Sequence, residues 1–203
     1  YQIEFRVFDV YRGEQLLGYK LNTDAAGMRS AAHKISDLIY EKLTGVKGVA
    51  STHIAYVSVT GDKLKPTYKL VVADADGENA RVLMESLQPI MSPAWSPDGR
   101  KLAYVSFENR QSQIFVQELR TGARRRVSAR KGVNSAPVWS PDGRFLAVTL
   151  SKGDGNLDIY KLELANQVLT RLTRWPSIET EPSWSVDGKA VYFTSDRSGG
   201  PQV

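Results

Sequence analysis

The phrase Ser-Pro-Ala-Trp-Ser-Pro-Asp-Gly fills residues 92–99, and two close copies follow it. Ala-Pro-Val-Trp-Ser-Pro-Asp-Gly fills 136–143, and Glu-Pro-Ser-Trp-Ser-Val-Asp-Gly fills 181–188. The tryptophans of the three copies lie 44 and then 45 residues apart. A repeat of that length, built from short strands and turns, indicates the blades of a β-propeller or a similar array. A propeller usually binds rather than reacts, because it presents variable loops on a repeated frame.

Each copy of the phrase predicts one reversal inside a four-stranded unit. Pro presets the backbone of a turn, and the following Asp-Gly favours the reversal itself. Runs of β-branched and aromatic residues follow at strand length. In the unit that holds Trp95, the expected strands are 93–95, 102–105, 114–116 and 126–128.

An earlier unit lacks the phrase but keeps the other strands. Residues 54–58 match 102–106 in sequence, and 68–72 and 81–83 follow as outer strands. The missing inner strand has two interpretations: sequence drift, or replacement by a segment near the C-terminus of the complete protein. We favour the second, because closing the ring removes exposed strand edges.

Residues 1–50 have a different pattern and predict the C-terminal part of a small α/β domain. A hairpin is followed by helical spacing of apolar residues from Ala25 to Leu43, with Asp24 or Thr23 as N-cap and Gly45 as the stop. A hairpin and one helix bury too little surface to fold alone. The expected division is therefore 1–50 for this part and 51–203 for an incomplete propeller, with blades that start near 54, 93, 137 and 182.

Composition argues against several classes of function. The 203 residues carry a net charge of +5 and include no cysteine, so disulfides and thiolate sites are excluded. The densest basic run, Arg124 to Arg126, lacks the interleaved aromatic residues of a nucleic-acid surface. No apolar run approaches the ~20 residues of a membrane span. Because the chain begins at Tyr, we expect it to be a processed or trimmed piece of a longer protein.

Catalytic and metal sites are not expected. His33 and His53 are the only histidines, and neither has a partner at ligand spacing, so we assign no metal, catalytic or cofactor role. Residues 154–158 resemble the start of a calcium loop, but Ile159 stands where that loop needs glycine. The Asp-Gly pairs are interpreted as turn formers, and the tryptophans as packing between blades.

The strand order of a propeller predicts which surface binds. The loops between second and third strands, and the segments that connect one blade to the next, open on one face, which we call the channel-mouth face. The connecting segments 88–93, 133–137 and 178–182 differ in sequence, whereas the turns of the opposite face repeat. Variable loops on a rigid frame carry specificity. The expected partner-binding residues are Met91, Ser92, Pro93, Asn134, Ser135, Ala136, Thr180 and Glu181.

The run from Gln88 to Gly99 and the following Lys101-Leu102-Ala103-Tyr104-Val105 resemble the TolB family of the Tol–Pal system of Gram-negative bacteria. So do 180–184, 193–196 and the hairpin and helix up to Gly45, and the resemblance covers essentially the whole chain. It implies a monomeric, six-bladed periplasmic propeller behind a small α/β domain, with roles in outer-membrane integrity and cell division. It also implies binding of the lipoprotein Pal at the channel-mouth face, and of TolA through an N-terminal segment absent here.

Two other classes remain as alternatives. The same Trp-Ser-Pro-Asp-Gly phrase occurs in the propellers that gate prolyl-oligopeptidase-like serine hydrolases, which need a Ser, Asp and His in a further domain. A lyase propeller would need clustered histidines, and the chain has two. The length of the complete protein discriminates: about two more blades favour the adaptor, and several hundred more residues favour the hydrolase.

Overall fold

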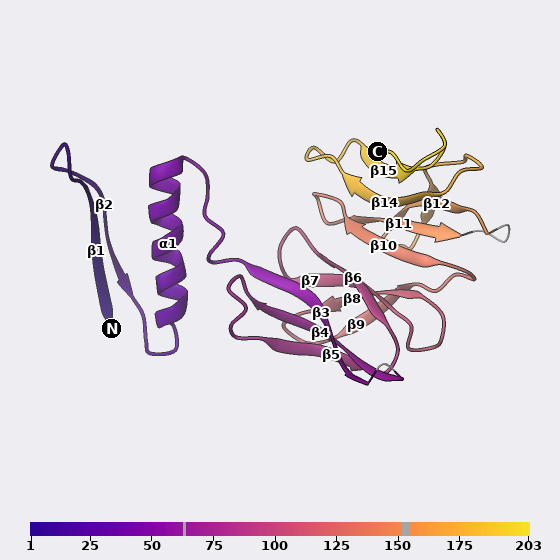
Figure 1. Cartoon of the computed structure of the whole chain (residues 1–203), viewed down its shortest axis with the longest axis horizontal. Coiled ribbons are helices and arrows are strands. Elements are labelled where there is room, and N and C mark those ends of the chain that lie inside the picture. The colour runs from indigo at the N-terminus through magenta and orange to yellow at the C-terminus, as the bar shows by residue number, and fades with distance from the viewer. Residues whose placement is uncertain (63, 152–154) are drawn as a thin grey trace. The chain divides into compact units, whose positions relative to one another are not determined.

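The strands form a succession of small antiparallel sheets, each made from consecutive stretches of chain (Figure 1). The computed structural model describes residues 1–62, 64–151 and 155–203. By its contacts the chain divides into two compact units, residues 1–54 with 72–81 and residues 55–71 with 82–203. The sheets of the second unit are propeller blades, as the repeat predicts, and in the described residues they form an open array.

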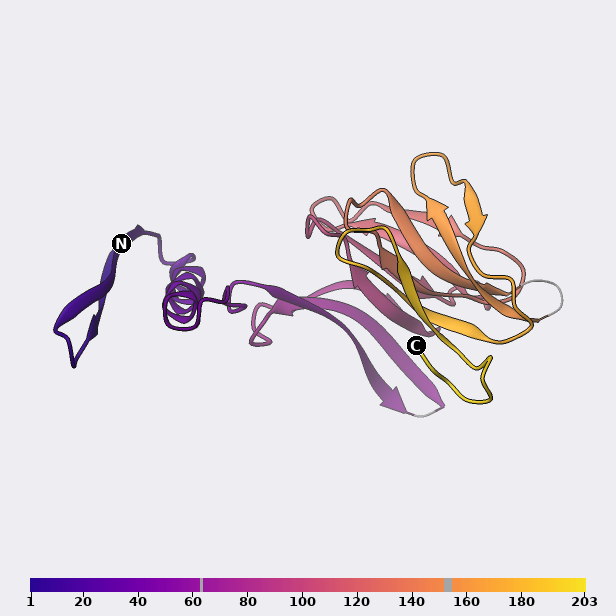
Figure 2. The ribbon, with the colours of Figure 1, turned by 90° about the horizontal axis from the view of Figure 1, so that it is seen from above.

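The blades follow one another in chain order, and Figure 2 shows them turned by 90°. The first blade has β3 (His53–Asp62), β4 (Lys65–Asp74) and β5 (Arg81–Ser86). The second has β6 (Ile90–Trp95), β7 (Lys101–Ser106), β8 (Gln113–Glu118) and β9 (Arg124–Ser128). The third has β10 (Asn134–Trp139), β11 (Phe145–Ser151), β12 (Leu157–Glu163) and β13 (Leu169–Arg171). The fourth has β14 (Glu179–Trp184) and β15 (Val191–Ser195).

The inner strands begin earlier than the sequence predicts. We expected starts near 93, 137 and 182, but β6, β10 and β14 begin at Ile90, Asn134 and Glu179. Proline cannot donate to the hydrogen-bond ladder of a sheet, so it favours a strand boundary. The strands instead continue through proline with a local shift in register, described below.

Alternating side chains join neighbouring blades. Ala103, Val105 and Ile114 of the second blade pack in one buried cluster with Leu146, Val148 and Leu150 of the third. The residues between them, Tyr104 and Phe115, point the other way and cluster with Leu70 of the first blade. Each blade of this middle region is therefore apolar on both faces, and full burial of one such side chain stabilises the fold by about 1.5–3 kcal/mol.

The tryptophans link successive blades at equivalent register positions, opposite Leu102, Leu146 and Val191. The indole Nε1 of Trp139 donates to the carbonyl of Ala94 at 3.0 Å, and that of Trp184 donates to the carbonyl of Val138 at 3.2 Å. Both acceptors directly precede the tryptophan of the previous blade. Trp139 is buried as expected, whereas Trp95 and Trp184 are half-buried. In the described residues Trp139 belongs to a four-stranded sheet and Trp184 to a two-stranded one.

The repeated turns form one polar network three times. The Ser140 hydroxyl donates to Asp142 Oδ1 at 2.6 Å, and the same oxygen accepts the Arg144 N–H at 3.0 Å. Ser96 with Asp98 and Ser185 with Asp187 repeat this arrangement. Two hydrogen bonds hold the pKa of each of these carboxyls below its usual range. The serine hydroxyl has the larger effect, and the backbone N–H has the smaller one. The interpretation of the Asp-Gly pairs as turn formers is confirmed.

The first unit holds a hairpin and a helix. The hairpin pairs β1 (Gln2–Asp9) with β2 (Glu14–Asn22), and α1 runs from Met28 to Thr44. Gly45 ends the helix as predicted, with φ of 75°. The predicted N-cap was wrong: the cap is Gly27, and the Asp24 carboxylate instead accepts the Gly27 N–H at 2.7 Å, so the helix starts three residues later.

Replacement of each tryptophan by phenylalanine tests the link between blades. Trp139→Phe removes a buried donor and should lower the free energy of unfolding by about 1–3 kcal/mol. Trp184→Phe should cost less, because Trp184 is half-buried. Trp95→Phe should cost least, because Trp95 is half-buried and the indole-to-carbonyl bonds found in the described residues belong to Trp139 and Trp184. Urea denaturation of the three variants measures this order, and an equal cost for Trp95→Phe and Trp139→Phe would contradict it.

Candidate partner-binding site at the inner-strand bulges

A β-bulge recurs at the start of each inner strand. The pairing register shifts between Met91 and Ala94 in β6, between Ser135 and Val138 in β10, and between Thr180 and Ser183 in β14. The bulged pairs are Ser92-Pro93, Ala136-Pro137 and Glu181-Pro182. They follow the same spacing of 44 and 45 residues as the tryptophans.

The residue before each of these prolines has a left-handed backbone. The φ angles are 51° at Ser92, 47° at Ala136 and 51° at Glu181. A residue with a β-carbon rarely adopts such angles, and a residue before proline normally prefers the extended region. Backbone strain of this kind persists only where the surroundings enforce it, and it gathers at functional sites. Three equivalent occurrences therefore mark the inner-strand starts as a candidate site.

The bulges coincide with the residues that the sequence selected. Met91, Ser92 and Glu181 are exposed; Pro93, Ser135 and Thr180 are half-buried; Ala136 and Asn134 are buried. The exposed members differ chemically from blade to blade, with an apolar side chain and a hydroxyl on the second blade and a carboxylate on the fourth. The repeated backbone thus presents side chains that do not repeat.

Asn134 has a different place from the one expected. Its side-chain oxygen accepts the Ser128 hydroxyl at 2.6 Å and the Arg130 N–H at 3.0 Å, and its amide nitrogen donates to the Arg130 carbonyl at 2.7 Å. The residue is fully buried. In this conformation Asn134 therefore offers no surface to a partner, and instead fixes the connecting segment that carries Ser135 and Ala136.

A buried carboxylate occupies the same position one blade later. Glu179 begins β14 as Asn134 begins β10, and it is also fully buried. Its Oε1 accepts a hydrogen bond from the Arg197 guanidinium at 2.6 Å. Sequence reasoning missed this pair, because it placed Glu179 in the connecting segment 178–182 and its partner Arg197 lies 18 residues further along the chain.

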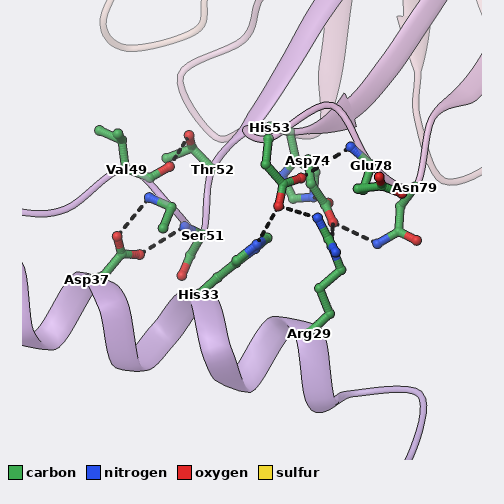
Figure 3. Close-up of polar contacts among 12 residues, drawn as sticks. Arg29, His33, Asp37, Val49, Ser51, Thr52, His53, Asp74, Glu78 and Asn79 are labelled. Atoms are coloured by element: carbon green, nitrogen blue, oxygen red, sulfur yellow. Dashed lines mark hydrogen bonds and ion pairs between the residues drawn. The ribbon is translucent and has the colours of Figure 1, made fainter.

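A second polar cluster lies in the first unit, along one stripe of α1 (Figure 3). Arg29, His33 and Asp37 are spaced four residues apart and share a helix face. Arg29 and His33 both bind the carboxylate of Asp76, the latter at 2.9 Å. Asp37 accepts the backbone N–H groups of Ala50 at 2.7 Å and of Ser51 at 2.9 Å. The helix therefore holds both the segment that follows it, at residues 50 and 51, and the distant Asp76.

The histidines thus have carboxylate partners that sequence spacing did not reveal. Besides the contact of His33 with Asp76, His53 Nε2 lies 3.6 Å from Asp74 Oδ1. The partners are distant along the chain, so only the fold brings them together. The Glu78 backbone N–H, then His33 and Arg29, hold the pKa of Asp76 below its usual range. In the described residues, no group of three or more possible ligands could hold a metal ion.

Asp158, one of the residues that suggested a calcium loop, has a different role. Asp154 lies outside the described residues. Asp158 is fully buried in β12, and its Oδ2 accepts a hydrogen bond from the Arg171 guanidinium at 2.6 Å. A carboxylate engaged in a buried ion pair serves the blade rather than a loop.

The comparisons agree with this fold. The family model described as the TolB beta propeller domain matches residues 40–203. The chain is 49% identical over 204 residues to the Tol-Pal system protein TolB of Bordetella pertussis. The match spans the whole of this chain and 45% of that relative. It is 55% identical over 140 residues to the Tol-Pal system protein TolB of Nitrosococcus oceani, a match of 67% of this chain and 32% of the relative.

A solved structure is similar along nearly the whole chain. The crystal structure of TolB from Acinetobacter baumannii superposes with a TM-score of 0.94 at 42% identity, over 99% of this chain and 50% of that one. The fold and the bulged inner strands define a β-propeller protein. The chain belongs to the TolB family, and it spans about half the length of the curated relatives that it matches in full.

The stripe on α1 makes a prediction for the first unit. Asp37→Ala removes the acceptor for two backbone N–H groups, so hydrogen exchange at the Ala50 and Ser51 amides should accelerate. Gly48→Ala should act in the same way, because a β-carbon there would lie 2.7 Å from Asp37 Cα. Ser36→Ala, one position away on α1, is the matched control. Unchanged exchange at residues 50 and 51 in Asp37→Ala would show that the carboxylate does not hold this segment.

Proposed function

We propose that the protein is a non-enzymatic periplasmic adaptor of the Tol–Pal system. Its channel-mouth face binds the peptidoglycan-associated lipoprotein Pal, and the adaptor thereby supports outer-membrane integrity and cell division. A second partner, TolA, binds through an N-terminal segment of the complete protein. The names of the relatives support membership of the system, and the repeated bulges support a binding face at the inner-strand starts.

One observation carries the proposal: three equivalent bulges hold different side chains in the same backbone geometry. A preorganised surface loses little conformational entropy when a partner binds. Met91 supplies an apolar contact, Ser92 and Thr180 supply hydroxyls, and Glu181 supplies an exposed charge. A small apolar centre with polar surroundings is typical of a protein–protein interface.

The same proposal includes the statement that the protein catalyses no reaction. The rival function, a propeller that gates a serine hydrolase, rests on the shared Trp-Ser-Pro-Asp-Gly phrase alone. Identity of 49% over the whole chain to a TolB relative favours the adaptor. A covalent active-site serine probe that labels the complete protein would favour the hydrolase instead.

Within the described residues, no helix has both the length and the apolar character needed to cross a bilayer.

Glu181 gives the sharpest test of the proposed face. If its carboxylate becomes desolvated against a donor of Pal, Glu181→Ala should weaken binding by about 2 kcal/mol or more, whereas a carboxylate at a wet rim would cost little. Ala136→Trp adds bulk at the neighbouring bulge and should also weaken binding. Calorimetric titration of the full-length protein with the soluble domain of Pal measures both effects.

Two variants serve as controls for this titration. Asp98→Ala lies in a turn of the opposite face and should alter stability without altering affinity. Ala136→Gly keeps the left-handed backbone without strain and should retain binding. Unchanged affinity in the double variant Glu181→Ala with Ala136→Trp would exclude this face as the Pal site.

A further inference from the structure

An exposed tryptophan, Trp175, lies in the segment that connects β13 to β14. The side chain of Trp175 is 58% exposed. The other tryptophans of the chain, at 95, 139 and 184, are buried or half-buried and follow the blade repeat. Trp175 lies outside the repeated phrase, and the other repeats have no tryptophan at the equivalent position. The architecture of the blade therefore does not require it.

The exposed indole is nevertheless held in place. The Arg197 guanidinium lies over the Trp175 ring, 5.4 Å from its centroid. Arg197 is fixed in turn by the buried Glu179 carboxylate at 2.6 Å and by the Ser195 hydroxyl at 3.0 Å. The Asn156 side chain donates to the Trp175 carbonyl at 2.8 Å. Both ring and backbone are therefore positioned before any partner arrives, which lowers the entropic cost of binding.

A hollow of about 590 Å³ adjoins the ring. Ile178, half of whose surface is exposed, contributes an apolar wall. The hollow is large enough to accept a side chain of a partner protein. Its lining residues besides Trp175 and Ile178 are Gly155, Asn156, Arg171, Arg174 and Pro176.

Three arginines lie around this hollow, and two of them already have carboxylate partners. Arg171 pairs with the buried Asp158, and Arg197 pairs with the buried Glu179, each at 2.6 Å. Arg174 lines the hollow and is exposed. A partner that docks here should therefore present a carboxylate to Arg174.

We propose that Trp175 is the anchor of the partner interface, and that its hollow receives an apolar side chain from an acidic segment of the lipoprotein Pal. Arg174 pairs with a carboxylate of that segment. This inference rests on the proposed function, and it adds a specificity-determining residue that lies outside the bulges. Tryptophan and arginine are the residues that most often dominate binding energy at interfaces.

Titration of the full-length protein with the soluble domain of Pal tests the anchor. Trp175→Ala should lower the affinity at least about tenfold without loss of thermal stability, because the side chain is exposed. Val186→Ala is the matched control: Val186 is 97% exposed on a turn of the opposite face and should have no effect. Arg174→Glu should weaken binding more strongly at low salt than at high salt, because salt screens exposed charges.

The outcomes separate this inference from the proposed function. If the wild-type protein does not bind Pal, both are wrong. If Glu181→Ala weakens binding but Trp175→Ala and Arg174→Glu do not, the anchor alone is wrong. If Val186→Ala weakens binding as much as Trp175→Ala, the effect is unspecific and the anchor is again overturned.

Discussion

The indole-to-carbonyl hydrogen bond between successive blades is the interaction on which the rest of the propeller depends. Trp139 donates to the residue before Trp95, and Trp184 donates to the residue before Trp139. The third and fourth blades therefore each take their position from the blade before them. The turns nest in the same order, since a β-carbon at Gly143 would lie 3.4 Å from Pro97 Cγ. With the blades fixed in this way, the segments that connect them have fixed ends.

That constraint explains how a repeated structure presents a surface that does not repeat. The bulges at Ser92, Ala136 and Glu181 have nearly the same φ, although their side chains carry a hydroxyl, a methyl group and a carboxylate respectively. Buried polar residues fix the segments that carry these bulges. Asn134 holds one connecting segment through its amide, and Glu179 holds another through Arg197. The strained backbone and the supporting network together make the inner-strand starts rigid, as an interface that must bind without rearrangement requires.

The repeat made much of the fold predictable, because the Asp-Gly turns and the tryptophans depend on local sequence. The bulges could not be predicted, since Pro93, Pro137 and Pro182 indicate a strand end as readily as a strand that shifts its register. Asn134 was expected at the surface, because its partners Ser128 and Arg130 are recognisable only after the segment folds back. His33 and Asp76 meet only through the fold. Trp175 was missed because exposure of an aromatic residue in a connecting segment carries no periodic signal.

Hydrogen exchange on the complex of the full-length protein with Pal tests the central claim most directly, because it locates the interface without a mutation. We expect slower exchange in residues 88–94, 133–138 and 172–183 when Pal is bound, with no change in the turns 96–99, 140–143 and 185–188. Protection of those turns, with unchanged exchange at the inner-strand starts, would place the partner on the opposite face and contradict the account.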